Sequence, residues 1–325
     1  MKAIVQERYG PPHEVLRLAE IDRPQFGDDD VLIRARATSV NTPDWIAVTG
    51  VPYILRLQSG LRGPRRAVRG SDVAGVVEEV GGNVAGLQPG DEVFGSSWAG
   101  SRTRSGTFAE LAVAPAPQLI AKPAGLSFDE AAGSVMSGIT ALLAMRDVGK
   151  VGPGKRVLVN GASGGVGTFA VQIARTLGAE VTGVCGPGSV ELVKSLGADR
   201  VIDYTKEDFT RADARYDVVL DNVLNHPPTA TARALAPSGT LIPNSVGNTG
   251  GLLAGLPRMA RAAVMRRAST VNCVVNRENL EALAALIRSG EVKVVIDRIY
   301  PLAEAASAVA HMLGHHAKGK VVIAV

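Results

Sequence analysis

A glycine-rich turn constrains the fold of this chain more than any other feature of its sequence. The turn reads Asn160-Gly161-Ala162-Ser163-Gly164-Gly165-Val166-Gly167, and it separates an apolar run at 156–160 from an amphipathic segment at 166–177. Glycines let the backbone approach a phosphate closely, and the free N–H groups at a helix N-terminus attract its charge. Ala162 stands where the strict fingerprint has a glycine. The turn predicts a dinucleotide site, and the alternative is a plain strand-to-helix turn.

The segment around this turn alternates between strands and helices. Apolar runs predict strands at 156–160, 181–184, 201–202, 217–221 and 240–243. Amphipathic segments between them predict helices at 166–177, 190–196 and 230–235. Strands that alternate with helices of about ten residues are typical of βαβ units and a parallel sheet. We therefore expect a doubly wound parallel sheet over residues 124–275.

The two ends of the chain are richer in short strands. Strands are predicted at 2–6, 31–37, 72–80, 108–113, 294–299 and 320–325, with helices at 127–147, 278–287 and 302–313. Ser127 and Glu130 have the spacing of a capping box at the start of the first of these helices. We predict an α/β chain in which residues 1–123 and 276–325 form one β-rich domain, with 124–275 inserted.

Composition excludes several classes of protein. The chain has 325 residues, 46% hydrophobic but only 4% aromatic, and a net charge of +4. This favours an aliphatic core over disorder or an aromatic nucleic-acid surface. Cys185 and Cys273 are too few for a disulfide framework and fit a reducing compartment. The first residues lack an apolar leader. We expect a cytoplasmic protein whose partners are neither membranes nor nucleic acids.

The end of the second strand of the α/β segment bears on the choice of cofactor. Sites that prefer NAD usually carry a carboxylate there, about twenty residues after the glycine turn. This chain has Cys185-Gly186-Pro187-Gly188-Ser189 instead, so no acidic side chain repels a 2′-phosphate, and no basic one attracts it. Ser189, Lys194 and Tyr204 are candidates for contacting the phosphate. We expect NADPH and leave NADH open.

Several motifs, taken in order, resemble the zinc-independent medium-chain dehydrogenase/reductase superfamily, close to quinone oxidoreductases and zeta-crystallin-like reductases. The resemblance covers essentially the whole chain. The matching motifs are Ser39-Val40-Asn41-Thr42-Pro43-Asp44, Gly70-Ser71-Asp72-Val73-Ala74-Gly75-Val76-Val77, Pro89-Gly90-Asp91-Glu92-Val93, the glycine turn, Leu196-Gly197-Ala198-Asp199 and Gly319-Lys320-Val321-Val322. The chain departs from this branch at Gly186-Pro187-Gly188-Ser189, where relatives often carry Ser-Thr-Arg-Asn with an arginine that binds the 2′-phosphate.

The resemblance implies a GroES-like catalytic domain around an inserted Rossmann domain, with the active site in the cleft between them, and a homodimer. It implies that Asn41 donates a hydrogen bond to the substrate oxygen, with Tyr53 and Asp44 as further catalytic candidates. Asn41 and Asp44 are alternatively caps of a turn or helix. The implied cofactor-binding residues are Thr140, Gly161, Ala162, Ser163, Gly164, Gly165, Val166, Gly167, Ser189, Tyr204, Asn222, Ser245 and Lys320. We add Cys185 to them, although it is alternatively a small apolar filler at the end of a buried strand.

The same comparison of motifs argues against zinc. Zinc-dependent relatives carry a cysteine near the position of Asn41 and Gly-His-Glu at the position of Gly70-Ser71-Asp72. A structural-zinc lobe with four cysteines is missing from 91–108, which has no cysteine. His311 and His315 have an i, i+4 spacing that suits Zn²⁺, but they lack the glutamate of an H-E-x-x-H motif, so a solvated helix end is the favoured interpretation. We expect no metal.

Without a Lewis acid, an alcohol is hard to oxidise, whereas a conjugated acceptor accepts hydride directly. The sequence therefore predicts transfer of hydride from NADPH to a quinone or an α,β-unsaturated carbonyl. The alternatives are an enoyl-thioester reductase, an alcohol dehydrogenase-like activity, and a nucleotide-binding redox sensor or RNA-binding protein without turnover. Arginine runs at 62–69 and 258–267 favour the last of these, although solvated loops explain them as well.

Overall fold

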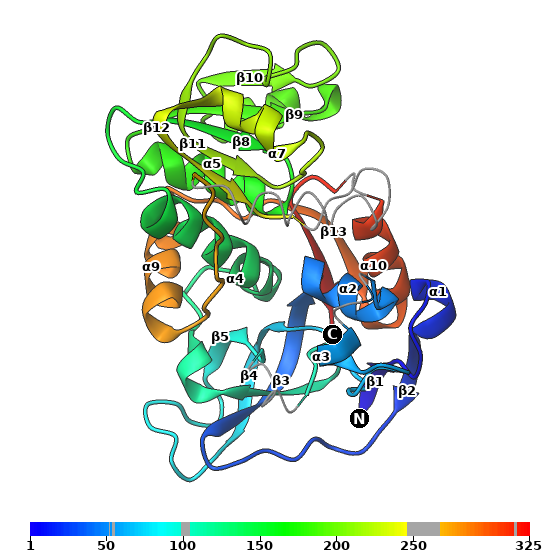
Figure 1. Cartoon of the computed structure of the whole chain (residues 1–325). Coiled ribbons are helices and arrows are strands. Elements are labelled where there is room, and N and C mark those ends of the chain that lie inside the picture. The colour runs from blue at the N-terminus through cyan, green and yellow to red at the C-terminus, as the bar shows by residue number, and fades with distance from the viewer. Residues whose placement is uncertain (52, 54–55, 99–104, 246–266, 315–316) are drawn as a thin grey trace. The chain divides into compact units, whose positions relative to one another are not determined.

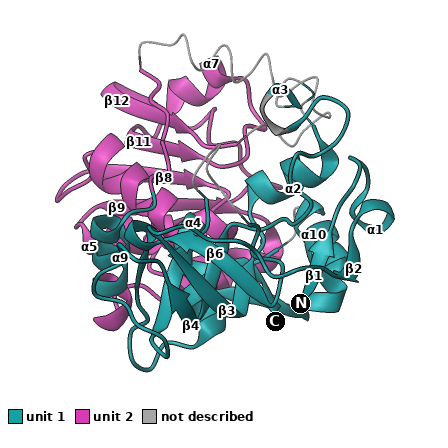
Figure 2. Cartoon of the chain, turned by 90° about the horizontal axis from the view of Figure 1, so that it is seen from below, with its two compact units in different colours: residues 1–137, 275–285, 294–325 teal, residues 138–274, 286–293 magenta. Residues whose placement is uncertain are grey.

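The computed structural model describes residues 1–51, 53, 56–98, 105–245, 267–314 and 317–325, which Figure 1 draws in colour. The chain divides into two compact units (Figure 2). Unit 1 comprises Met1–Ser137, Val275–Ala285 and Val294–Val325, and unit 2 comprises Gly138–Val274 and Leu286–Lys293. The chain first passes between units inside helix α4 (Phe128–Leu143), beyond the predicted bound at 123/124. The predicted bounds of the functional domains stay a prediction.

Unit 2 contains a parallel sheet of five strands in the order β10-β9-β8-β11-β12. Its strands are β8 (Arg156–Asn160), β9 (Glu180–Cys185), β10 (Arg200–Asp203), β11 (Tyr216–Asp221) and β12 (Leu235–Pro243). The connecting helices include α5 (Gly165–Thr176), α6 (Val190–Ser195) and α7 (Pro228–Thr231). The predicted parallel sheet is confirmed. Because parallel strands are covered on both faces, residues such as Leu158, Val184 and Val219 are fully buried.

Unit 1 is built on a sheet of seven strands. The order is β13-β14-β3-β4-β5-β7, with β6 paired to β3. The strands are β3 (Asp30–Ser39), β4 (Asp72–Val80), β5 (Glu92–Ser96), β6 (Leu111–Pro115), β7 (Leu119–Ala121), β13 (Ile296–Pro301) and β14 (Lys320–Ala324). All pairs are antiparallel except β13 with β14. The GroES-like sheet and the Rossmann sheet expected from the resemblance are both present.

The remaining elements of unit 1 flank this sheet. They are the two-stranded sheet of β1 (Lys2–Val5) and β2 (Arg17–Glu20), and the helices α1 (Pro12–Val15), α2 (Thr42–Thr49), α3 (Arg56–Ser59) and α10 (Ala305–Leu313). Helix α9 (Arg277–Arg288) belongs to unit 1 up to Ala285. The strand predicted at 108–113 begins later, at Leu111, because Ala109 forms a bridge with Ala3 of β1.

Helix α4 begins with the predicted capping box. The backbone N–H of Glu130 donates to Ser127 Oγ at 3.2 Å, and the N–H of Ser127 donates back to Glu130 Oε2 at 3.0 Å. These bonds satisfy two N–H groups that lack partners within the helix. After Leu143 the helix widens into a π-helical turn, Ala144–Val148. The confirmed cap fixes where this helix starts, and therefore which of its side chains face the sheet of unit 1.

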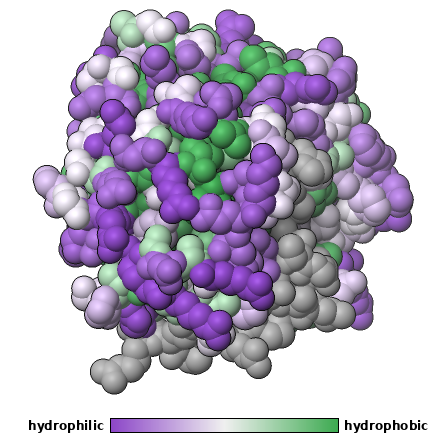
Figure 3. Space-filling model, turned by 90° about the horizontal axis from the view of Figure 1, so that it is seen from above, coloured by the Kyte–Doolittle hydropathy of each residue, from purple (hydrophilic) through white to green (hydrophobic). Residues whose placement is uncertain are grey.

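None of the helices that the structure describes combines the length and the apolar character needed to cross a bilayer. On the face seen in Figure 3, hydrophilic side chains surround smaller groups of hydrophobic ones. The predicted cytoplasmic location stays a prediction.

Candidate functional site

The glycine turn joins β8 to α5, and its geometry depends on two glycines. Gly161 has a φ of +77°, which L side chains rarely adopt. The N–H groups of Gly161 and Ala162 donate to Val184 O of β9, at 3.1 and 2.9 Å. A Cβ atom on Gly167 would lie 2.1 Å from Gly161 O, which is far inside contact distance. Only glycine at position 167 lets the helix pack this closely on the turn.

The N-terminus of α5 is available to an anion. The helix begins at Gly165, and no side chain caps it. The first N–H groups of a helix have no partner within it, and the helix dipole places partial positive charge there. A diphosphate would be held by these backbone groups without any basic side chain. The residues of this turn therefore fit a dinucleotide, whose binding here stays a prediction.

Three predicted cofactor residues lie around the end of β9. Cys185 ends the strand with 3% of its surface exposed, and burial together with nearby Asp203 raises the pKa of its thiol to about 11. This thiol stays protonated and is no nucleophile. The N–H of Ser189 donates to Gly186 O at 3.0 Å. A Cβ atom on Gly186 would lie 3.2 Å from Tyr204 Oη, so the Tyr204 ring lies against the backbone here.

The carboxyl ends of β8 and β11 hold a buried hydrogen-bond network that sequence reasoning missed. Asp221 Oδ1 accepts from Asn160 Nδ2 at 2.8 Å and from the N–H of Leu224 at 2.9 Å. Burial raises the pKa of Asp221. Asn222, a predicted cofactor residue, donates from Nδ2 to Asn160 O at 3.2 Å and accepts from Asn244 Nδ2 at 2.8 Å. This network fixes the Asn222 amide, and its sequence signal is polar residues that follow apolar strands.

Two further predicted cofactor residues lie in other elements of unit 2. Thr140 is buried on α4, and Ser245 follows Asn244 after the end of β12. The cofactor contacts of all these residues stay predictions.

A second buried polar network lies in unit 1, where β3, β4, β14 and α4 meet. Asn41 is 2% exposed, and its side-chain amide both donates and accepts a hydrogen bond. Its Nδ2 donates to Asp72 Oδ2 at 2.7 Å, and its Oδ1 accepts from Lys320 Nζ at 2.5 Å. Asp72 Oδ2 also accepts from Ser39 Oγ at 2.7 Å. The network therefore joins a carboxylate, an amide and an ammonium in series.

The sequence predicts that Lys320 contacts the cofactor, but in the structure its ammonium donates hydrogen bonds to three acceptors of the protein. Its Nζ donates to Val40 O at 3.2 Å and to Ser137 Oγ at 3.1 Å, in addition to Asn41. These three acceptors take all three protons of the ammonium. Burial lowers the pKa of Lys320, while Asp72 and Asp44 raise it. Its direct contact with the cofactor stays a prediction that this geometry does not favour.

Asp44 occupies the position expected of a cap at the start of α2. Its Oδ2 accepts from the backbone N–H of Asn41 at 2.8 Å. Burial, with a smaller contribution from Asp72, raises the pKa of Asp44 to about 7, while the N–H of Asn41, Lys320 and Arg69 lower it. The capping interpretation of Asp44 is therefore confirmed, and its catalytic role stays a prediction.

Tyr53 is not part of either network as the structure describes them. Its side chain is 69% exposed, and its ring lies 4.7 Å from the guanidinium carbon of Arg56. Its predicted role as a proton or hydrogen-bond donor gains no support from this position.

The donor set in unit 1 does not fit the zinc of the dehydrogenase relatives. The positions of their ligands hold the Asn41 amide, the Ser71 hydroxyl and the Asp72 carboxylate, and the Lys320 ammonium contacts this set directly. A fixed positive charge beside the donors opposes a divalent cation.

The histidine pair is a separate candidate for a metal site. His311 Nε2 lies 2.6 Å from Asp297 Oδ2, and the second histidine of the predicted spacing, His315, is outside the described residues. Within those residues, no cluster of three metal-ligating side chains occurs.

The first arginine run is exposed at Arg62 and Arg65, as the interpretation of solvated loops expects, but not at Arg69. Arg69 is buried, its Nε donates to Gln6 Oε1 at 2.6 Å, and burial lowers its pKa to about 10. Arg267 donates to Ala236 O, at the start of β12. The rest of the second run, 258–266, lies outside the described residues.

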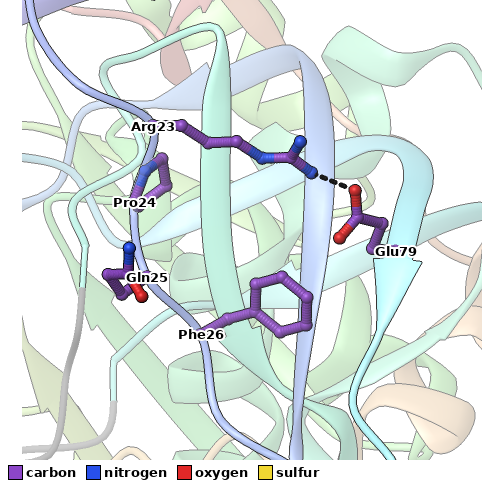
Figure 4. A pocket seen from close by; sticks show the side chains of 5 residues that line it. All are labelled: Arg23, Pro24, Gln25, Phe26 and Glu79. Carbon is purple, nitrogen blue, oxygen red and sulfur yellow. Dashed lines mark hydrogen bonds and ion pairs between the residues drawn. The ribbon is translucent and has the colours of Figure 1, made fainter.

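A cavity of about 260 Å³ opens near the start of β3. It is lined by Arg23, Pro24, Gln25, Phe26 and Glu79. Arg23 and Glu79 bind each other at 2.5 Å across it, as Figure 4 shows. Its two charged groups are therefore paired with each other, and we assign no function to it.

Comparison with known proteins agrees with this architecture. A family model described as an alcohol dehydrogenase GroES-like domain matches residues 27–124, and one described as a zinc-binding dehydrogenase matches residues 196–323. A chloroplastic quinone oxidoreductase of Triphysaria versicolor is 32% identical over 338 residues, covering 99% of this chain and 98% of the relative. A mitochondrial NAD(P)H oxidoreductase of Mus musculus is 32% identical over 363 residues, covering 99% and 89%. The solved quinone oxidoreductase of Coxiella burnetii superposes with a TM-score of 0.85 at 29% identity, covering 100% and 99%.

The chain therefore belongs to the medium-chain dehydrogenase/reductase superfamily, among its quinone oxidoreductase-like members. It is an oxidoreductase of that family. The family resemblance drawn from the sequence motifs is confirmed.

Proposed function

We propose that this protein transfers a hydride from NADPH to a quinone or an α,β-unsaturated carbonyl, without zinc. The observation that carries the proposal is the Lys320 ammonium, 2.5 Å from Asn41 Oδ1, beside the positions where relatives hold a catalytic metal. Without a Lewis acid to stabilise its alkoxide, an alcohol is harder to oxidise. A conjugated acceptor needs only orientation and a proton, and the residues of this network supply such groups.

The chain's own residues have three tasks in this reaction. The α5 N-terminus holds the diphosphate, and Asn222 is fixed for contact with the cofactor by its bonds to Asn160 and Asn244. When bound, NADPH supplies the hydride. Asn41 orients the acceptor. Its Nδ2 donates one proton to Asp72, and it lies 3.4 Å from Ser39 Oγ and 3.5 Å from Ser39 O, distances at which a hydrogen bond from the second proton is weak. That second proton is the one we assign to the acceptor oxygen.

The preference for NADPH rests on the end of β9. No carboxylate of this strand faces a 2′-phosphate, and Ser189 and Tyr204 both lie around Gly186. Hydroxyl groups bind phosphate oxygens without the charge of an arginine. We therefore propose a preference for NADPH that is smaller than in relatives with an arginine at this position.

We infer a homodimer formed at the β12 edge of the unit 2 sheet. Leu241 of β12 also pairs with the segment 267–269, which follows the five strands of this sheet in the sequence. Its N–H donates to Arg267 O at 2.8 Å, and its O accepts from the N–H of Ser269 at 2.9 Å. Backbone groups at the edge of a sheet are suited to pairing with a second copy of the chain. Light scattering coupled to size-exclusion chromatography tests the mass, and a monomer at micromolar concentration would refute the dimer.

The experiment for the proposed activity follows NADPH oxidation with a panel of acceptors. 1,4-Naphthoquinone and 2-cyclohexen-1-one are compared with crotonyl-CoA, and 2-butanol with NADP⁺ tests the reverse chemistry. The proposal predicts turnover of the quinone or the enone and none of the alcohol. If the thioester is reduced far faster than either free acceptor, the protein is an enoyl-thioester reductase. If no acceptor is reduced although a fluorescence titration shows that NADPH binds, the protein binds the nucleotide without turnover of this panel.

A further inference from the structure

Reduction of a conjugated acceptor requires a proton as well as a hydride, and the unit 1 network contains a side chain suited to deliver it. Ser137 lies on α4, and its Oγ accepts a hydrogen bond from Lys320 Nζ at 3.1 Å. A hydroxyl that accepts from an ammonium must turn its own proton elsewhere. Among the described residues, Ser137 Oγ donates to no acceptor, whereas serines within helices often donate to a carbonyl of the preceding turn.

Packing of α4 on β14 brings these two groups together. A Cβ atom on Gly133 would lie 3.6 Å from Lys320 Cβ and 3.5 Å from Val322, so the helix approaches the strand closely at this glycine. Ser137 follows Gly133 by four residues and therefore lies on the same face of the helix. The Lys320 side chain runs along this face from Gly133 to Ser137. Gly133 therefore lies beside the start of the Lys320 side chain, and Ser137 lies at its end.

Burial of Lys320 favours loss of its proton, although its two carboxylate neighbours oppose it. The ammonium is faced by Asp72 from β4, by Asp44 and Asn41 from the β3–α2 segment and by Ser137 from α4. Burial lowers the pKa of Lys320, against the opposing effect of the two aspartates. A donor is most effective when its pKa lies near that of the group it protonates. A lowered lysine pKa approaches those of hydroquinones and enols.

We propose that Ser137 and Lys320 form a two-residue proton relay to the oxygen of the reduced acceptor. The proposal rests on the proposed function. As the acceptor gains hydride at carbon, its carbonyl oxygen gains the Ser137 Oγ proton, and a Lys320 Nζ proton moves to Ser137 Oγ. One C–H and one O–H bond form on the acceptor, which is reduced while the nicotinamide is oxidised. Lys320 is left neutral and recovers its proton from water.

The position of Ser137 relative to Thr140 supports this assignment. Thr140 follows Ser137 by three residues on α4 and lies one turn further along the same face. Thr140 is one of the predicted cofactor-binding residues. If it contacts the cofactor, the Ser137 hydroxyl lies one helical turn from that contact.

The test is steady-state reduction of 1,4-naphthoquinone by NADPH in variants of the full chain. Ser137→Ala is expected to lower kcat by about 100-fold, with little change in KM or in NADPH affinity. Ser137→Thr keeps a hydroxyl and is expected to retain most of kcat. Ser134→Ala is the matched control, because Ser134 Oγ is buried on the same helix but donates to Ala131 O at 2.8 Å. Lys320→Arg keeps the charge but cannot be deprotonated, so it should resemble Ser137→Ala.

A proton inventory separates a relay from a structural role. In mixtures of H₂O and D₂O, two protons in flight give a curved dependence of kcat on deuterium fraction in the wild type, and Ser137→Ala should make it linear. Full activity in Ser137→Ala, or a linear wild-type inventory, would overturn the relay while leaving the proposed function intact. A wild-type protein that reduces neither quinone nor enone would overturn the proposed function, and the relay with it.

Discussion

Gly167 shows how strongly one missing side chain controls this site. Gly167→Ala would place a Cβ atom 2.1 Å from Gly161 O, so either the turn or α5 must shift. We expect a loss of about 1–3 kcal/mol of stability, the usual cost of overpacking, and a weaker affinity for NADPH. Denaturant unfolding and fluorescence titration with NADPH measure the two effects.

The matched control is Gly164→Ala. Its Cβ atom would be 3.5 Å from the nearest heavy atom, which is ordinary contact. This variant should keep its stability, and it is a control for packing only, because Gly164 is itself a predicted cofactor contact. Equal stability of the two alanine variants would contradict the packing that we assign to Gly167.

Asp44 gives stability a dependence on pH with a definite sign. Its folded-state pKa is raised from 3.8 to about 7, so the folded protein prefers the protonated acid. The unfolded chain ionises first as pH rises, and stability is lost between about pH 4 and pH 7, by on the order of 4 kcal/mol. Asp44→Asn cannot ionise and should lack this loss. Unfolding of both proteins across this range measures the difference, and parallel curves would contradict it.

At the scale of elements, β3, β4 and β14 are held together by a buried ion pair that acts through Asn41. Lys320→Met would leave Asp72, which is fully buried, without its cation. We expect a loss of about 3–5 kcal/mol in the free energy of unfolding. The double variant Lys320→Met/Asp72→Leu removes both charges and should recover part of that loss. If the double variant is less stable by the sum of the two single effects, the two charges are not coupled.

The end of β9 determines the cofactor preference. With Cys185-Gly186-Pro187-Gly188-Ser189 in this position, neither an acidic nor a basic side chain of the strand's end acts on the 2′-phosphate. NADPH should bind more tightly than NADH, by less than about 10-fold, the effect of roughly one good hydrogen bond. Fluorescence titrations with the two dinucleotides measure the ratio. Tighter binding of NADH would reverse our assignment.

At the scale of the whole molecule, local patterns in the sequence predicted much of the fold and little of the unit 1 network. The strand at Arg156–Asn160, the helix after it and the Ser127 capping box depend on neighbouring residues, and the structure confirms them. The contact of Lys320 with Asn41 joins residues 279 positions apart. No periodicity encodes such a pair, because the sheet register that brings β14 beside β3 is a property of the folded unit. The contact of Ser137 with Lys320 is not predictable from the sequence for the same reason, because it joins residues 183 positions apart.

We propose that this protein reduces its acceptor without a metal ion. The most direct measurement is the zinc content of the purified protein by mass spectrometry, together with NADPH-dependent reduction of 1,4-naphthoquinone before and after dialysis against EDTA. Our account predicts a protein without stoichiometric zinc whose kcat is unchanged by the chelator. Activity that is lost on dialysis and restored by added Zn²⁺ would contradict it.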